Sequence, residues 1–99
     1  MTIGRVLKLI RTHKNYSQAE MARKLDVTQN FLSQVENSKK NLSQATLSDF
    51  ANKLAISKEI LTIAGCDIPQ EFQDEDRQKF IDMQKFALKV ILLEQPQTT

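Results

Sequence analysis

Apolar residues recur along most of the chain at intervals of three and four, the spacing that places side chains on one face of an α-helix. The first run predicts a helix over residues 3–13. Ser17 followed by Glu20 has the spacing of a capping box, so it predicts the start of a second helix. Thr28 can cap a third. So few residues separate the second and third helices that the two must meet at a steep angle, with Val27 in the corner.

The later apolar runs predict three more helices. Serine N-caps begin two short ones, and Gly65 is expected to end the second of these in a left-handed conformation. Residues 66–73 predict a linker, and residues 74–95 a longer amphipathic helix. The pattern therefore predicts an all-α fold, with five helices in residues 1–65 and one C-terminal helix beyond the linker.

Composition supports this fold class. The chain has 99 residues, of which only two are glycine and two proline. Hairpins and tight βα turns depend on those residues, which makes all-β and doubly wound folds improbable. An apolar fraction of 40% with 26% charged residues is ordinary for a globular domain and argues against disorder.

Charge is distributed unevenly along the chain. Residues 1–65 hold ten lysines and arginines against five acids, whereas residues 66–99 hold four against seven. An excess of positive charge in the first part favours a polyanionic partner for it.

The sequence lacks the signals that are typical of membrane proteins, secreted proteins and metal-binding proteins. The longest apolar stretch, 90–93, is far shorter than the roughly 20 residues of a membrane span. No signal peptide is visible and Cys66 is the sole cysteine, so we expect a cytoplasmic protein without a membrane. His13 and Cys66 have no second ligand at metal-binding spacing, and acids 74–76 fit a helix N-terminus better than a cation site. We expect no metal, no cofactor and no enzymatic activity.

The segment at residues 17–37 is SQAEMARKLDVTQNFLSQVEN. It resembles the helix-turn-helix of the Cro and phage-repressor (Xre-type) family of transcriptional regulators. The resemblance extends over residues 3–65 and implies a five-helix domain that binds double-stranded DNA. Three positions depart from the family pattern: Asp26 and Ser38 stand where glycine is common, and Leu42 where proline is common.

The third helix carries the candidate DNA-contacting residues. Leu32 and Val35 are predicted to face inward, and four polar residues face outward: Gln29, Asn30, Ser33 and Gln34. Glutamine and asparagine can bond adenine through two hydrogen bonds in the major groove. The resemblance likewise assigns base contacts to Gln29, Asn30 and Gln34. The alternative is that these side chains merely solvate an exposed helix face.

Other positions are expected to contact phosphate or to support the helix. The predicted phosphate contacts, partly from the resemblance, are Gln18, Thr28, Asn37, Lys39 and Lys40. The two lysines could instead be a solvated pair. Phe31 is expected to be partly buried, with an edge that can touch a thymine methyl group. The resemblance implies an internal ion pair between Arg11 and Glu36.

The C-terminal helix is apolar over more surface than one packing face requires. The residues assigned to a dimer or partner surface are Phe80, Met83, Phe86, Ala87, Val90 and Ile91. The alternative is that this helix folds back on its own domain. The resemblance, together with this apolar helix, implies a repressor that binds an inverted repeat as a homodimer joined by the helix. One alternative is an antitoxin-like DNA-binding protein whose C-terminal helix binds a regulatory protein partner. Another is an interaction module that has lost DNA binding.

Overall fold

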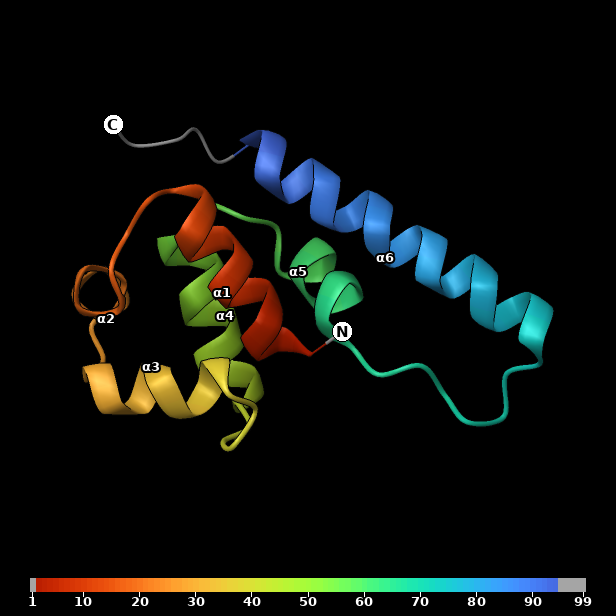
Figure 1. Cartoon of the computed structure of the whole chain (residues 1–99), viewed down its shortest axis with the longest axis horizontal. Helices are drawn as coiled ribbons and strands as arrows, with labels where there is room; N and C mark the ends of the chain where they lie inside the picture. Colours follow the sequence, from red (N-terminus) through yellow and green to blue (C-terminus); the bar gives the residue numbers. More distant parts are fainter. Residues whose placement is uncertain (1, 95–99) are drawn as a thin grey trace.

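The computed structural model describes residues 2–94, and within them it contains six helices and no strand (Figure 1). The all-helical fold class is confirmed. The helices are α1 (Ile3–His13), α2 (Gln18–Leu25), α3 (Gln29–Glu36), α4 (Gln44–Lys53), α5 (Lys58–Gly65) and α6 (Asp74–Glu94). Gln95, which the predicted last helix includes, lies outside the described residues. No described helix is both long and apolar enough to cross a membrane.

Short polar side chains begin five of these helices. In each, a hydroxyl oxygen accepts a hydrogen bond from the N–H three residues later, which satisfies a backbone donor that the helix leaves free. The capping residues are Thr2, Ser17, Thr28, Ser43 and Ser57. Ser17 and Glu20 form the predicted capping box, with both bonds at 3.1 Å. The Ser17 N–H and hydroxyl lower the pKa of Glu20 below its ordinary value.

Each of the first four helices is followed, within two residues of its end, by a residue with positive φ that is not glycine. These residues are Asn15, Asp26, Ser38 and Ala55, with φ between 57° and 60°. After each of them, the next N–H donates to a carbonyl five residues back at 2.8–3.0 Å, as in a Schellman motif. Asp26 and Ser38, the two departures from the family glycines, therefore take the left-handed conformation that glycine favours.

The prediction for Gly65 was wrong. This residue is the last of α5, and no described glycine has a positive φ. A Cβ atom at Gly65 would lie 2.3 Å from Ile3 Cδ1 and 2.8 Å from Ile3 Cα. Glycine is needed here because the end of α5 lies against the start of α1, rather than for a left-handed turn.

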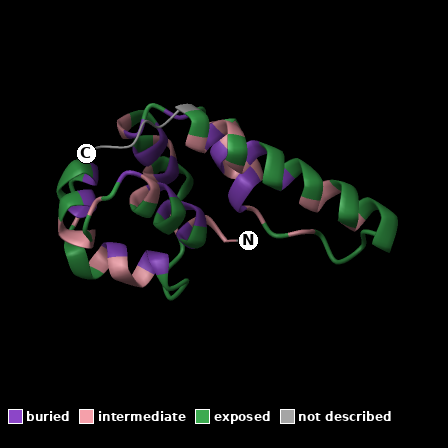
Figure 2. Ribbon diagram, turned by 45° about the horizontal axis from the view of Figure 1, so that its top comes forward, coloured by how far each residue is buried: buried purple, intermediate pink, exposed green. Residues whose placement is uncertain are grey.

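Helix α1 lies in the middle of the fold, with α3 on one side and α6 on the other (Figure 1). The largest fully buried side chains come from all six helices: Leu7, Ile10, Met21, Leu25, Leu32, Phe50, Leu61 and Ile91. Figure 2 shows this core as the buried inner surfaces of the helices, with exposed residues around it. Val27 is half-buried against the core between α2 and α3, as its corner position predicts.

Helix α6 folds back onto α5 and α1. Its inner face therefore follows the alternative prediction, in which this helix packs on its own domain. Gln84 is buried, and its Nε2 donates to the carbonyl oxygens of Ile63 at 3.1 Å and Cys66 at 2.6 Å. These carbonyls lie at the end of α5, where the helix leaves backbone acceptors free. The amide of Gln84 thus sets the rotation of α6 about its own axis.

The predicted dimer surface therefore needs correction. Ala87 and Ile91 are 7% and 0% exposed because they pack into the core of their own domain, so neither can contact a second chain. Phe80 is half-buried and packs edge-to-face on Phe72, with ring centroids 5.8 Å apart. Three residues of the predicted set remain outside this packing: Met83, Phe86 and Val90.

Candidate nucleic-acid interface

Helix α3 packs on the rest of the protein through one side only. Leu32, Val35 and Glu36 are at most 4% exposed and face the core. Before α3, the left-handed Asp26 ends α2 with φ 59° and ψ 47°, which turns the chain into the second helix of the pair. The opposite side of α3 lies at the outer edge of the fold (Figure 1) and is free to meet a large partner.

The four residues predicted to contact bases lie on this outer side. Gln29 and Asn30 are exposed, and Ser33 and Gln34 are half-exposed. Ser33 Oγ accepts a bond from Asn37 Nδ2 at 3.4 Å. Within the described residues, the side-chain amides of Gln29, Asn30 and Gln34 have no hydrogen-bond partner. Their paired donors and acceptors are thus available for base edges, as direct contact in the major groove requires.

Phe31 and Lys40 form a second element of this surface. Phe31 is half-buried and packs against the core, and Lys40 Nζ lies 5.3 Å from its ring centroid. This cation–π contact holds an exposed charge next to α3. Thr28 Oγ1 accepts a bond from the Phe31 N–H at 3.0 Å. The Thr28 hydroxyl proton remains free to be donated to a phosphate oxygen.

The loop after α3 carries the remaining predicted phosphate contacts. Asn37, Lys39 and Lys40 are all exposed. The Lys39 N–H donates to the Gln34 carbonyl at 2.8 Å, and the hydroxyls of Ser38 and Thr2 are 3.0 Å apart. These bonds hold the loop at the end of α3 and against the start of α1.

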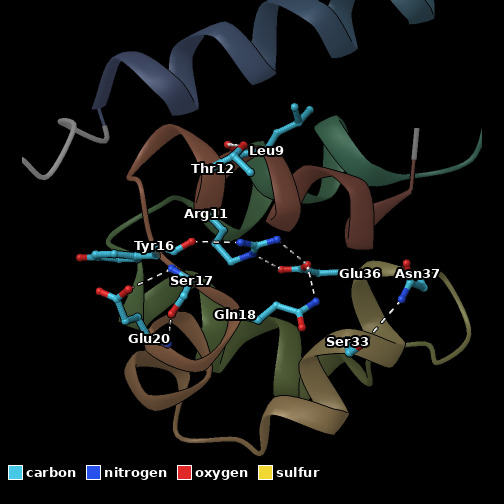
Figure 3. Close-up of polar contacts among 10 residues, drawn as sticks. All are labelled: Leu9, Arg11, Thr12, Tyr16, Ser17, Gln18, Glu20, Ser33, Glu36 and Asn37. Carbon is cyan, nitrogen blue, oxygen red and sulfur yellow. Dashed lines mark hydrogen bonds and ion pairs between the residues drawn. The ribbon is translucent and has the colours of Figure 1, made fainter.

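A buried network fixes α3 to α1 and α2 (Figure 3). Arg11 Nε lies 2.8 Å from Glu36 Oε2, and a second guanidinium nitrogen donates to Glu36 Oε1 at 3.2 Å. A third donates to the Tyr16 carbonyl at 3.0 Å. The side chains of Arg11 and Glu36 are 14% and 1% exposed, so the pair is shielded from water.

Gln18 joins this network, a bond the sequence did not predict. Its Nε2 donates to Glu36 Oε1 at 3.1 Å (Figure 3), so one of the donors expected at phosphate is used inside the protein. Its other N–H stays available because the residue is only half-buried. The position of Gln18 is thereby coupled to the end of α3.

The exposed charges on the outer side of α3 and in the loop after it are all positive. Glu36 is the single acid of α3, and its carboxylate is buried and paired with Arg11. The outer side of α3 thus carries no negative charge, while Lys39 and Lys40 add positive charge beside it. Such a surface favours a polyanion. Within residues 2–94, no group of three or more His, Cys, Asp or Glu side chains could hold a metal ion.

Gly4 is a supporting residue that sequence reasoning missed. A Cβ atom at this position would lie 1.9 Å from the Val35 carbonyl oxygen and 2.9 Å from the Val35 carbonyl carbon. Only glycine lets α1 approach the backbone of α3 this closely. The available signal was a glycine inside an otherwise regular helical run, which costs helix stability unless packing requires it.

Comparison with known proteins agrees with this geometry. The family model described as Helix-turn-helix matches residues 7–61, which is more than half of the chain and includes α2 and α3 entire. No curated protein and no solved structure was found to match. By the family match, the chain belongs to the Cro and phage-repressor type of helix-turn-helix proteins, a family of DNA-binding regulators.

Proposed function

We propose that this protein is a transcriptional repressor that binds an inverted repeat in double-stranded DNA as a homodimer, with α3 in the major groove. The observation that carries the proposal is the outer side of α3, where three amide side chains have no partner within the described chain. The buried Arg11–Glu36 pair holds that side in place. Bound at a promoter, the protein would block access of RNA polymerase.

The size of α3 supports two copies per site. The helix has eight residues, so it is about 12 Å long and spans about four base pairs. A site this short recurs too often in a genome to be selective. Two copies related by two-fold symmetry contact half-sites about 34 Å apart, on the same side of the duplex, and double the sequence contacted.

Selection of the purified protein on a random duplex library at near-physiological salt tests this function. We expect enrichment of an inverted repeat with half-sites about one helical turn apart. Enrichment of an isolated half-site would contradict the dimer. No enrichment at all would contradict sequence-specific binding and support the interaction-module alternative.

Gln34→Ala is expected to weaken binding to the selected site by about 1–3 kcal/mol and to relax preference at one base position, because it removes two hydrogen bonds to one base. Titration of the selected duplex and its single-base variants measures both effects. Gln70→Ala, an exposed amide in the linker, is the matched control and should change neither. Equal losses on selected and random duplexes would show that Gln34 does not contact bases.

Lys40→Ala is expected to weaken binding to all duplexes alike. Removal of one phosphate contact should reduce the slope of log affinity against log salt by about one unit. Titrations at several salt concentrations measure the slope. Lys79→Ala on α6, on the far side of the fold from α3, should leave it unchanged. A Lys40→Ala slope equal to that of the unaltered protein would remove Lys40 from the phosphate contacts.

A second candidate function is an antitoxin-like or partner-regulated protein, in which α6 binds another protein. Phe86 and Met83, which are 67% and 46% exposed on α6, favour it. A stable heterocomplex that copurifies with the chain and is lost in Phe86→Lys would support this candidate.

A further inference from the structure

Helix α6 has two apolar sides. Its inner side, with Ala87 and Ile91, packs on the domain. A second stripe lies on the outer side, because its members are spaced by three, four and three residues and so follow one face of the helix. These residues are Met83 (46% exposed), Phe86 (67%), the half-buried Val90 and Leu93 (80%). We call them the outer stripe. An apolar surface of this kind marks a contact with another molecule.

The charges that border the outer stripe are self-complementary. Asp82 and Lys89 are exposed, lie on the same edge of the stripe two helical turns apart, and have Phe86 between them. If a second α6 packs antiparallel across a two-fold axis between Lys85 and Phe86, Asp82 lies opposite Lys89 of the partner subunit, and Lys89 opposite the partner's Asp82. In the same register Met83 lies about 3 Å along the helix axis from the level of Val90 of the partner subunit, within reach of a side-chain contact. The stripe therefore fits a second copy of this chain.

The surface beside Phe86 also has room for the ring of Phe86 of the partner subunit. A hollow of about 250 Å³ beside Phe86 is lined by Asp82, Lys85 and Lys89 as well as the ring itself. An aromatic side chain inserted there would contact Phe86, with charged groups around it. Central aromatic contacts surrounded by polar groups are typical of protein interfaces.

The outer stripe lies outside the packing of α6 on its own domain, and α1 lies between α6 and α3. Figures 1 and 3 both show α6 on one side of α1 and α3 on the other. A two-fold axis reverses the direction of the contact it relates. The second copy, packed on the outer stripe, thus carries its own α3 on its far side. Such a pair places the two α3 helices on opposite outer sides, an arrangement that suits two separate duplexes better than neighbouring grooves of one.

From these observations we infer that α6 joins copies of this protein that are bound to separate DNA segments, and so bridges or loops DNA. This inference rests on the proposed binding of DNA through α3. The two copies on one inverted repeat direct their outer stripes away from that DNA, where each can pair with a copy on another repeat. The inference replaces the sequence-based expectation that this helix joins the two copies on a single repeat.

A two-duplex capture assay tests the inference. One duplex with the selected site is immobilised, the protein is added, and retention of a second, fluorescent duplex with the same site is measured. The unaltered protein should retain the second duplex. Phe86→Lys should reduce retention at least tenfold, while its affinity for a single duplex stays within twofold. Phe86 is largely exposed, so this change should leave the fold intact, which the thermal unfolding midpoint checks.

Charge reversal tests the antiparallel register. Asp82→Lys and Lys89→Asp should each reduce retention, because each places like charges opposite one another. The double variant Asp82→Lys/Lys89→Asp restores both pairs and should restore retention. Failure of the double variant to exceed the single variants would contradict this register. Lys8→Ala on α1, outside the stripe, is the control.

Other outcomes would overturn the inference. If Phe86→Lys weakens binding to a single duplex as much as it reduces capture, α6 joins copies on one repeat. If the unaltered protein binds single duplexes but captures no second one, and sediments alone as a monomer, the stripe does not bind a second copy. If it binds no duplex at all, the proposed function fails; sedimentation of unaltered and Phe86→Lys protein still reports separately on α6 pairing.

Discussion

Replacing Glu36 with leucine is expected to lower the free energy of unfolding by about 3–5 kcal/mol. The substitution keeps most of the side-chain volume but removes the carboxylate that accepts bonds from Arg11 and Gln18. Arg11 is then left with a charge in a site that is 14% exposed, without its partner. Because a small domain is stable by only about 5–15 kcal/mol, this loss removes a large fraction of the total stability. Urea titration followed by circular dichroism measures it.

Two further variants separate the charge effect from the loss of packing. In Arg11→Met/Glu36→Leu both charges are gone, so stability should recover much of the way toward that of the unaltered protein. Glu71→Leu, an exposed acid in the linker, should change stability by no more than about 0.5 kcal/mol. A single Glu36→Leu variant as stable as this control would mean that the pair does not hold α3.

Gly4→Ala is expected to destabilise the protein by about 1–3 kcal/mol, which is the cost of inserting a methyl group into a packed contact. The sign is informative because alanine in a helix is otherwise favoured over glycine by up to about 1 kcal/mol. At this site the new Cβ would lie 1.9 Å from the Val35 carbonyl oxygen, a backbone atom that cannot rotate away. The same urea titration measures the effect.

Displacement of α3 should also lower the affinity of the protein for the selected duplex. Since Gly4 contacts the end of α3, Gly4→Ala should reduce affinity for the selected duplex even under conditions where the protein stays folded. Lys8→Ala, at an exposed position of the same helix, should leave both stability and affinity close to their original values. A Gly4→Ala variant more stable than the unaltered protein would show that α1 and α3 are not in this close contact.

The sequence predicted the helices well because the signals for them are local. Apolar spacing and a capping hydroxyl lie within one helix, so the starts at Ser17, Thr28 and Ser43 follow from neighbouring residues. The helix ends were harder to predict. Glycine is the usual left-handed residue, which led to the wrong expectation for Gly65, whereas Ala55 adopts that conformation without any local signal. Ala55 itself is exposed, but its neighbours Leu54 and Ile56 are buried in the core, and a local pattern does not show that burial.

The two apolar sides of α6 show a second limit. Hydrophobic spacing indicates which residues share a face, but not whether that face meets the same chain or another. One contact that holds the inner side is made by Gln84, a polar residue whose amide donates to carbonyls at the end of α5. The bond between Gln18 and Glu36 was missed for the same reason, because its partners come from different helices. On α3, by contrast, the predicted outer residues are exposed or half-exposed, since positions on one side of a helix recur about every 3.6 residues.

The separation of the two sides of α3 has a consequence for how this protein can evolve. The residues that hold the helix, Leu32, Val35 and Glu36, are distinct from Gln29, Asn30 and Gln34, whose side chains bond nothing else in the described chain. Under the proposed function, codon changes at those three outer positions after a gene duplication would redirect one copy to a new set of promoters at little cost in folding. The scaffold would be inherited unchanged while the regulatory circuit diverged.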